Sequence, residues 1–339
     1  MTGEKPIQTG TQRGEGAVGQ KPRAAWRQIF GRQEFGVFII LAAMVLFLAV
    51  YTKTFLAGTN ISNILRDFSW IAIAAFGECM VVITGGIDLS VGSVMGLSGL
   101  ITAMLFARDM PIPVAVAGGL ATGLLVGLVN GLMVTKGKLP PFIATLGTMF
   151  MARGLCYGLS GGWPVRDLPS AFNNLGRGVV SIGGFDLPLP AIFMLVCAII
   201  VSAYLTRTVW GYRIYAVGGN ETATSLSGIN TSLVKIMVYS LAGLLTAVGG
   251  ILMTARLGVA SPMAGQGYEL DVIAAAVVGG TSLSGGEGTI LGVLIGAAIM
   301  QVLRNGLVLT GVSAYWLQFM QGLVIVVLIL LDQLRKQRR

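Results

Sequence analysis

The sequence predicts an all-α integral membrane protein, and three observations support this fold class. Hydrophobic residues make up 54% of the 339 residues and charged residues only 11%, whereas a soluble domain carries about 25% charged residues. The mean hydropathy is +0.80. The apolar residues fall into ten runs, and several approach the length of about 20 residues that a helix needs to span a bilayer.

The predicted membrane segments follow one another with short polar breaks. In chain order they are Phe35–Tyr51, Ile61–Thr84, Ser90–Ala107, Val114–Val134, Phe142–Leu159, Leu189–Leu205, Leu233–Ala255, a broken segment from Glu269, Thr289–Leu303 and Tyr315–Leu331. Residues 160–187 are expected to form the longest loop between two segments. Residues 206–232 form a second polar connection.

These segments make up a polytopic domain over residues 35–334, with a tail on each side. Residues 1–34 are rich in Gly, Gln, Lys and Arg and are expected to be a disordered tail, too long and polar for a signal peptide. Residues 335–339 form a short basic tail. An even number of segments puts both termini on one side, which then holds fifteen Lys and Arg against six on the other. The positive-inside rule predicts that this side is the cytoplasm.

Composition also excludes several functions. The net charge of +9 lies at the flanks of the membrane segments, so we expect no nucleic-acid partner. The chain has no His, which removes Ser-His and Cys-His catalysis and the commonest metal ligand. It has no G-x-x-x-x-G-K-[ST] loop for nucleotide phosphates. We therefore expect no enzyme activity, cofactor or metal site. Cys79, Cys156 and Cys197 each lie alone in an apolar segment and are expected to be small core residues.

The stretch Gly267–Gly288 is central to the interpretation. Its apolar part, Val272–Val278, is too short to cross a bilayer and breaks at Gly279 into hydroxyls and glycines. Irregular backbone at membrane depth is tolerated only where it is buried in protein or lines a water-filled path. Interrupted helices are also where transporters place their pathway.

An internal echo accompanies this break. Gly85–Gly92 reads GGIDLSVG and Gly279–Gly286 reads GGTSLSGG, and each sequence closes an apolar segment. Corresponding breaks in internal repeats are typical of transporters. The echo does not show whether the repeats are parallel or inverted.

Five acids lie in or beside apolar segments, where a carboxylate is costly and usually faces a cavity or a partner: Glu78, Asp88, Glu269, Asp271 and Glu287. They are candidates for binding a coupling cation or proton. Asp88 and Glu287 are also candidate helix caps, since each precedes an apolar run. Glu269 and Asp271 are expected at the outer water interface. Glu78 is either a structural hydrogen-bonding residue or part of the pathway.

Glycine recurs at every fourth position in two segments, at Gly119, Gly123, Gly127 and Gly131 and at Gly288, Gly292 and Gly296. Such faces let helix backbones approach closely in lipid. They indicate either a subunit interface or close packing within one subunit.

In the polar connection of residues 206–232, Asn220–Leu226 is predicted to form a short helix, with Asn220 as its cap and Gly228 as its stop. Three aromatic residues precede it: Trp210, Tyr212 and Tyr215. A short amphipathic helix between two spans suits docking into the groove of a partner, and an ordinary connector is the alternative.

Four motifs, in this order, resemble the permease subunits of ribose-type sugar ABC importers: ITGGIDLSVGS, LPPFIATLGTM, GYRIYAVGGNETATSLSGIN and GYELDVIAAAVVGGTSLSGGEGTILG. The resemblance covers nearly everything from Phe35 onward. It implies a multi-pass protein of the bacterial inner membrane that pairs with a second permease, as a homodimer or a heterodimer. It also implies a cytoplasmic ATPase, often with two fused ATP sites, and a periplasmic sugar-binding protein.

In such permeases the segment matching Gly218–Asn230 is the coupling loop that seats in the ATPase. The residues carried over to this role are Gly218, Gly219, Asn220, Glu221, Ala223, Leu226 and Gly228. The candidates for the translocation pathway are Glu78, Asp88, Ser90, Ser93, Asp271, Thr281, Ser282 and Ser284. Their hydroxyls suit weak, transient hydrogen bonds to a neutral sugar.

Other readings stay open at this point. Xylose, arabinose, galactose, a polyol or a signalling furanose are alternative cargoes. An ion-coupled secondary transporter that works through Glu78, Asp88 or Asp271 is the rival from another class. A membrane-embedded enzyme is disfavoured, since no nucleophile elbow is present.

Overall fold

The computed structural model describes residues 33–183 and 185–313 and, after them, only scattered residues up to Val326. The predicted disordered tail lies outside the described residues except for its last two, 33 and 34, which are helical. The predicted basic tail, residues 335–339, and most of the predicted segment Tyr315–Leu331 also lie outside them.

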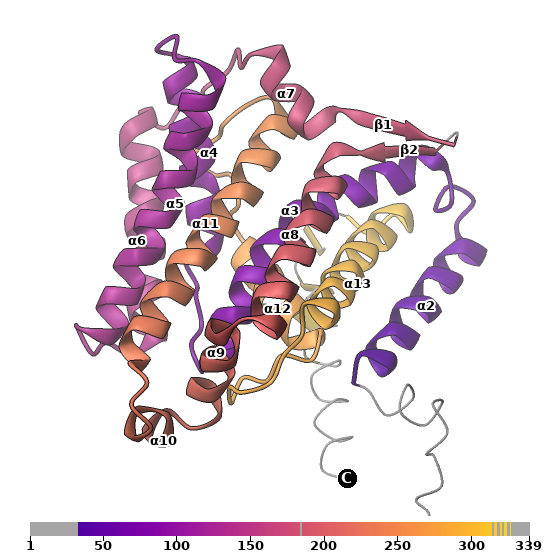
Figure 1. Cartoon of the computed structure of the whole chain (residues 1–339). Helices are drawn as coiled ribbons and strands as arrows, with labels where there is room; N and C mark the ends of the chain where they lie inside the picture. Colours follow the sequence, from indigo (N-terminus) through magenta and orange to yellow (C-terminus); the bar gives the residue numbers. More distant parts are fainter. Residues whose placement is uncertain are drawn as a thin grey trace, which may run out of the picture.

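The described part of the chain is a bundle of helices with one small β-hairpin (Figure 1). In chain order the elements are α2 (Gln33–Tyr51), α3 (Gly58–Ile83), α4 (Val91–Phe106), α5 (Ile112–Thr135), α6 (Pro141–Ser160), α7 (Ser170–Arg177), β1 (Val179–Ile182), β2 (Phe185–Pro188), α8 (Leu189–Arg207), α9 (Val209–Gly219), α10 (Glu221–Leu226), α11 (Thr231–Leu257), α12 (Tyr268–Val278) and α13 (Ile290–Leu309).

Among the described residues, six helices are long and apolar enough to cross a membrane: α2, α5, α6, α8, α11 and α13. This confirms the prediction of a helical protein with several apolar spans. Three more helices coincide with predicted segments. Helix α3 has 26 residues but carries Arg66, Asp67 and Glu78, while α4 and α12 have only 16 and 11 residues. The count of ten segments therefore stays a prediction.

The two ends of the bundle differ in what they carry. One end holds α9 and α10 and is called the α10 end, and the other holds α7 and the hairpin and is called the α7 end (Figure 1). Helices α5 and α8 run from the α7 end to the α10 end, and α6 and α11 return.

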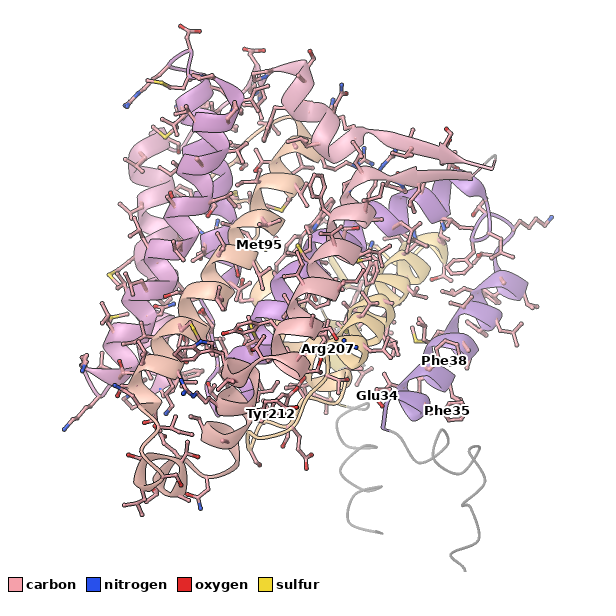
Figure 2. The ribbon with its side chains drawn as sticks, in the orientation of Figure 1. Glu34, Phe35, Phe38, Met95, Arg207 and Tyr212 are labelled. Carbon is pink, nitrogen blue, oxygen red and sulfur yellow. The ribbon has the colours of Figure 1, made fainter. Side chains whose placement is uncertain are left out.

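Helix α11 lies at the centre, against α3, α4 and α5. Met95 of α4 lies beside it (Figure 2). On α5, Gly123 and Gly127 leave no room for a Cβ atom, because they face backbone atoms of Gly243 and Tyr239 of α11. The glycine face of α5 thus serves close packing within the subunit, as the second of the two predicted alternatives has it.

The second glycine face behaves in the same way. Gly292 and Gly296 of α13 pack against backbone atoms of Gly279 and Ala275, at the end of α12 and just after it. Because Gly292 and Gly296 have no side chains, the short helix α12 packs closely against α13.

The chain returns into the bundle between α11 and α12. After Gly258, which ends α11 in the left-handed conformation with φ of 71°, residues 259–267 reach α4, where Gly265 packs against Gly92. Arg153 of α6 donates to the carbonyl oxygens of Pro262 and Ala264 at 2.6 and 2.8 Å. Irregular backbone is thus hydrogen-bonded inside protein, as it must be at membrane depth.

Residues 160–187 are not a simple loop, in contrast to the prediction. They contain α7 and an antiparallel hairpin, in which Val179 pairs with Pro188. Phe172 of α7 is fully buried, with its ring centroid 4.9 Å from that of Phe106. Burial of this aromatic ring and the hydrogen bonds of Arg177 to Arg256 and Leu257 hold the segment on the bundle, although its sequence is polar and rich in Gly, Pro and Asn. The all-α class therefore carries this one small β element.

Candidate functional site

The second GGxxLSxG sequence lies against the end of α3, directly before the first, at the α10 end. The amide of Gly286 donates to the carbonyl oxygen of Ile83, the last residue of α3, at 2.9 Å. The Sγ atom of Cys79 and the Oγ1 atom of Thr281 are 3.4 Å apart. Helices α3 and α12 therefore reach the same end of the molecule, and each continues there into an unwound turn.

The first turn, residues 84–90, encloses a buried polar cluster. The amide of Asp88 donates to Oε1 of Glu78 at 3.1 Å. Oδ1 of Asp88 accepts from the amide of Ser90 at 2.8 Å and from its hydroxyl. Nδ2 of Asn130 on α5 donates to Oγ of Ser90 at 3.0 Å and to Oδ2 of Asp88 at 3.4 Å. Glu78, Ser90 and Asn130 are fully buried, and Asp88 is 3% exposed.

Three members of this cluster were not predicted. Asn130 is the only carboxamide in its apolar run, a signal that points to a polar role. Thr145 on α6 accepts from the amide of Leu89 at 3.2 Å and donates to the carbonyl oxygen of Ile87 at 3.1 Å. The hydroxyl of Tyr239 on α11 points at Gly86 of the turn. Nothing in their spacing marks Thr145 or Tyr239.

The remaining predicted hydroxyls do not share one surface. Ser93 is buried in the first turn of α4, and Thr281 is buried next to α3. Ser282 is half-buried, and its amide closes the second turn by donating to the carbonyl oxygen of Glu287 at 3.0 Å. Ser284 is exposed at the α10 end. The structure thus gathers Glu78, Asp88 and Ser90 and leaves Ser284 apart from them.

Asp271 lies apart as well, and it is not at a water-exposed interface. It is 8% exposed, and its Oδ2 atom is 3.7 Å from Nη1 of Arg304 on α13. The Arg304 guanidinium lies over the ring of Tyr268 at 5.5 Å. Glu269 is also half-buried. Both acids are drawn inward because residues 259–267 carry the start of α12 back into the bundle.

The predicted caps turn out differently. Ser90, not Asp88, occupies the cap position of α4. Asp88 accepts from the amide of Ser90 and so holds the turn. Glu287 is exposed, and Thr289 caps α13 by accepting from the amide of Gly292 at 3.1 Å. A hydroxyl directly before the helix is closer to the free amides than a carboxylate two residues earlier.

The short helix predicted in residues 206–232 is confirmed as α10. Oδ1 of Asn220 caps it by accepting from the amide of Ala223 at 2.9 Å, and Gly228 follows it with φ of 83°. Oγ1 of Thr224 donates to the carbonyl oxygen of Ala216 at 2.8 Å, which ties α10 to α9. The aromatic residues lie on α9, where Arg213 covers the ring of Trp210 at 4.7 Å.

Helix α9 packs against the end of α3 and against the second turn. Gly218 packs so tightly against the carbonyl oxygen of Ile83 and the amide of Gly286 that no Cβ atom fits. The hydroxyl of Tyr215 donates to the carbonyl oxygen of Gly288 at 2.8 Å. Burial raises the pKa of Tyr215 to about 12, so this hydroxyl keeps its proton at neutral pH. Helix α9 therefore bears directly on the end of α3 and on the turn that leads from α12 to α13.

The outer face of this segment is exposed and partly apolar. Leu226 at the end of α10 is 85% exposed and Tyr212 on α9 is 67% exposed, the latter at the α10 end (Figure 2). Nζ of Lys235 binds Oε2 of Glu221 at 2.7 Å, which fixes α10 against the start of α11. A rigid helix that shows a leucine to solvent is suited to docking.

Comparison with known proteins identifies the family of this chain. Residues 60–329 match the family described as branched-chain amino acid transport system / permease component. The ribose import permease protein RbsC of Bacillus subtilis (strain 168) is 44% identical over 303 residues, which cover 89% of this chain and 93% of that protein. RbsC of Escherichia coli (strain K12) is 43% identical over 301 residues, covering 87% and 92%.

A more distant relative has a different cargo in its name. The galactose/methyl galactoside import permease protein MglC of Escherichia coli (strain K12) is 36% identical over 322 residues, which cover 91% of this chain and 96% of that protein. No solved structure matches this chain.

Proposed function

Since this chain belongs to the family of branched-chain amino acid transport system permease components, we propose that it is the permease subunit of an ATP-binding-cassette importer and carries ribose or a closely similar monosaccharide. The relatives named as ribose import permeases are 43–44% identical to it, whereas the galactose permease is 36% identical. Galactose, xylose, arabinose, polyols and signalling furanoses are the alternatives.

The observation that carries this proposal is the way in which α9 and α10 pack against the bundle. The ATPase is a separate polypeptide, with two fused ATP sites, that binds the segment Gly218–Gly228. Leu226 supplies an exposed apolar anchor. Because Gly218 contacts Ile83 and Gly286 directly, closure of the ATPase moves the unwound ends of α3 and α12 together.

The proposed pathway runs past these two turns. Ser90, Ser93, Thr281 and Ser282 are the hydroxyls that bind sugar weakly as the turns move. Glu78 and Asp88 hold the first turn. Asp271 belongs to the pathway only if its pairing with Arg304 opens during transport. Ser284, exposed at the α10 end, would meet the cargo on its release.

The proposed orientation puts the α10 end in the cytoplasm of a bacterial inner membrane, with ten segments and both termini on that side. Helix α2 begins at the α10 end, where Oε1 of Glu34 accepts from the hydroxyl of Thr289 at 3.1 Å (Figure 2). The chain works as a homodimer or as a heterodimer with a related permease.

The α7 end then faces the periplasmic sugar-binding protein. It carries three arginines fixed by hydrogen bonds. Arg66 donates to the carbonyl oxygen of Arg177, Arg177 to those of Arg256 and Leu257, and Arg256 to the side chain of Asn63. Fixed cations at a surface favour a partner with acidic groups.

The test is affinity purification of the tagged chain in mild detergent, with every co-eluting chain identified by mass spectrometry. Recovery of an ATPase with phosphate-binding loops is expected, and a second permease in the eluate would establish a heterodimer. Uptake into proteoliposomes is expected to require ATP, the ATPase and the binding protein. Uptake that runs on a sodium or proton gradient without ATP would refute the importer and favour the ion-coupled alternative.

A further inference from the structure

The polar cluster around residues 84–90 contains two buried acids. Glu78 is fully buried and Asp88 is 3% exposed. The ion pairs found in the described part of the chain join Lys235 to Glu221 and Arg304 to Asp271, so neither buried acid has a basic partner there. Buried charges are normally paired or bound to a metal ion, since desolvation is costly.

The two acids are not equally satisfied. Asp88 accepts three hydrogen bonds, from the amide and hydroxyl of Ser90 and from Asn130. It also lies just before the first turn of α4, where the helix dipole favours a negative charge. Glu78 accepts one hydrogen bond, from the amide of Asp88. Glu78 is therefore the less satisfied of the two acids.

Three oxygen atoms of the cluster are buried without a hydrogen-bond partner: Oε2 of Glu78, Oδ1 of Asn130 and the hydroxyl oxygen of Tyr239. They come from α3, α5 and α11, and each belongs to a side chain at the turn. Asn130 is fully buried and Tyr239 is 1% exposed. Unsatisfied buried polar atoms are rare and call for an occupant.

The chemistry of these atoms selects the occupant. All three are oxygens, the ligands that hard cations prefer. The described residues hold no group of three or more His, Cys, Asp or Glu side chains suited to a metal ion, so a transition metal is disfavoured. A single cation can draw on all three oxygens at once. We propose that the Glu78, Asn130 and Tyr239 oxygens bind one alkali-metal cation.

This ion is structural and differs from the coupling ion of a secondary transporter. The cluster is closed to solvent in this conformation, so the ion does not exchange with either side here. By linking α3, α5 and α11 it adds to the hydrogen bonds that hold the 84–90 turn. The proposal does not depend on which sugar is carried.

The experiment measures thermal unfolding of the full chain in lipid nanodiscs, in NaCl, KCl and choline chloride at equal ionic strength and one pH. NaCl or KCl is expected to raise the midpoint by about 5 °C over choline chloride, as for a ligand that binds only the folded state. Glu78→Gln is expected to abolish this rise. Asp109→Asn, at an exposed acid in the loop before α5, is expected to keep it.

A second variant covers the case in which Glu78→Gln fails to fold. Tyr239→Phe removes one ligand oxygen and nothing else, and it is expected to reduce the rise to less than half. The proposal is refuted if the wild-type midpoint is the same in all three salts. It is equally refuted if the midpoint follows pH but not the cation, because Glu78 would then be neutralised by a proton.

Discussion

Two neighbouring glycines provide a direct test of how α9 is fastened to the bundle. Both Gly218 and Gly219 lie in the last turn of α9, and neither has a positive φ. At Gly218 a Cβ atom would meet the carbonyl oxygen of Ile83 and come within 2.5 Å of the amide nitrogen of Gly286. At Gly219 it would meet nothing within 4 Å. The same substitution, Gly→Ala, is therefore expected to act in opposite directions.

The magnitudes follow from two opposing effects. Alanine in place of glycine reduces the entropy of the unfolded chain and stabilises by about 0.4–1 kcal/mol where the backbone allows it. Overpacking costs about 1–3 kcal/mol, and the upper value applies at Gly218 because the opposing atoms are backbone and cannot change rotamer. Gly219→Ala is expected to stabilise by about 0.5 kcal/mol, and Gly218→Ala to destabilise by about 2 kcal/mol.

The assay is chemical unfolding of both variants in nanodiscs, together with ATP-dependent sugar uptake and co-purification of the ATPase. Gly218→Ala is expected to lose most uptake, since α9 is pushed away from the ends of α3 and α12, while Gly219→Ala keeps it. Equal effects of the two variants on stability would show that α9 does not bear on Ile83 and Gly286, and the proposed route of coupling would be wrong.

The remaining predictions concern three other contacts. Leu226→Ala is expected to leave the unfolding midpoint unchanged and to weaken ATPase binding about 30-fold, because about 2 kcal/mol of apolar burial is lost at the interface; Leu257→Ala, exposed at the α7 end, is the control in the same binding assay. Asn130→Ala removes the donor to Asp88 and Ser90 and is expected to destabilise the fold by about 2 kcal/mol in chemical unfolding; no loss would remove Asn130 from the cluster. Arg304→Gln is expected to destabilise by about 1 kcal/mol, and the double variant with Asp271→Asn to recover that loss; additive effects of the two changes would argue against their pairing.

Local sequence was enough where local chemistry decides the structure. The cap at Asn220, the stop at Gly228 and the helix between them depend on hydrogen bonds spanning a few residues, so α10 was predictable residue by residue. Helix α7 was not, because it is held by residues far away in the chain, through the contact of Phe172 with Phe106 and the hydrogen bonds of Arg177 to α11.

The candidate site was predictable only in part for the same reason. Glu78, Asp88 and Ser90 stand out because acids and hydroxyls are rare in apolar runs. Asn130 and Tyr239 complete the cluster from α5 and α11, and no spacing in the sequence relates them to the turn. The position of Asp271 also had to come from the structure, since the return of residues 259–267 into the bundle places it next to Arg304.

By itself the sequence determined a helical membrane protein, its broken segments, its family resemblance and the docking helix, because hydropathy, capping and motif identity are properties of contiguous residues. Only the tertiary structure decided that the second GGxxLSxG turn meets the end of α3, that Gly218 of α9 packs against both, and that the glycine faces pack within the subunit. Those facts depend on which helix backbones touch, and in a chain this apolar many pairings satisfy the pattern equally well. Close packing of glycine against backbone, as at Gly127 and Gly218, selects one of them.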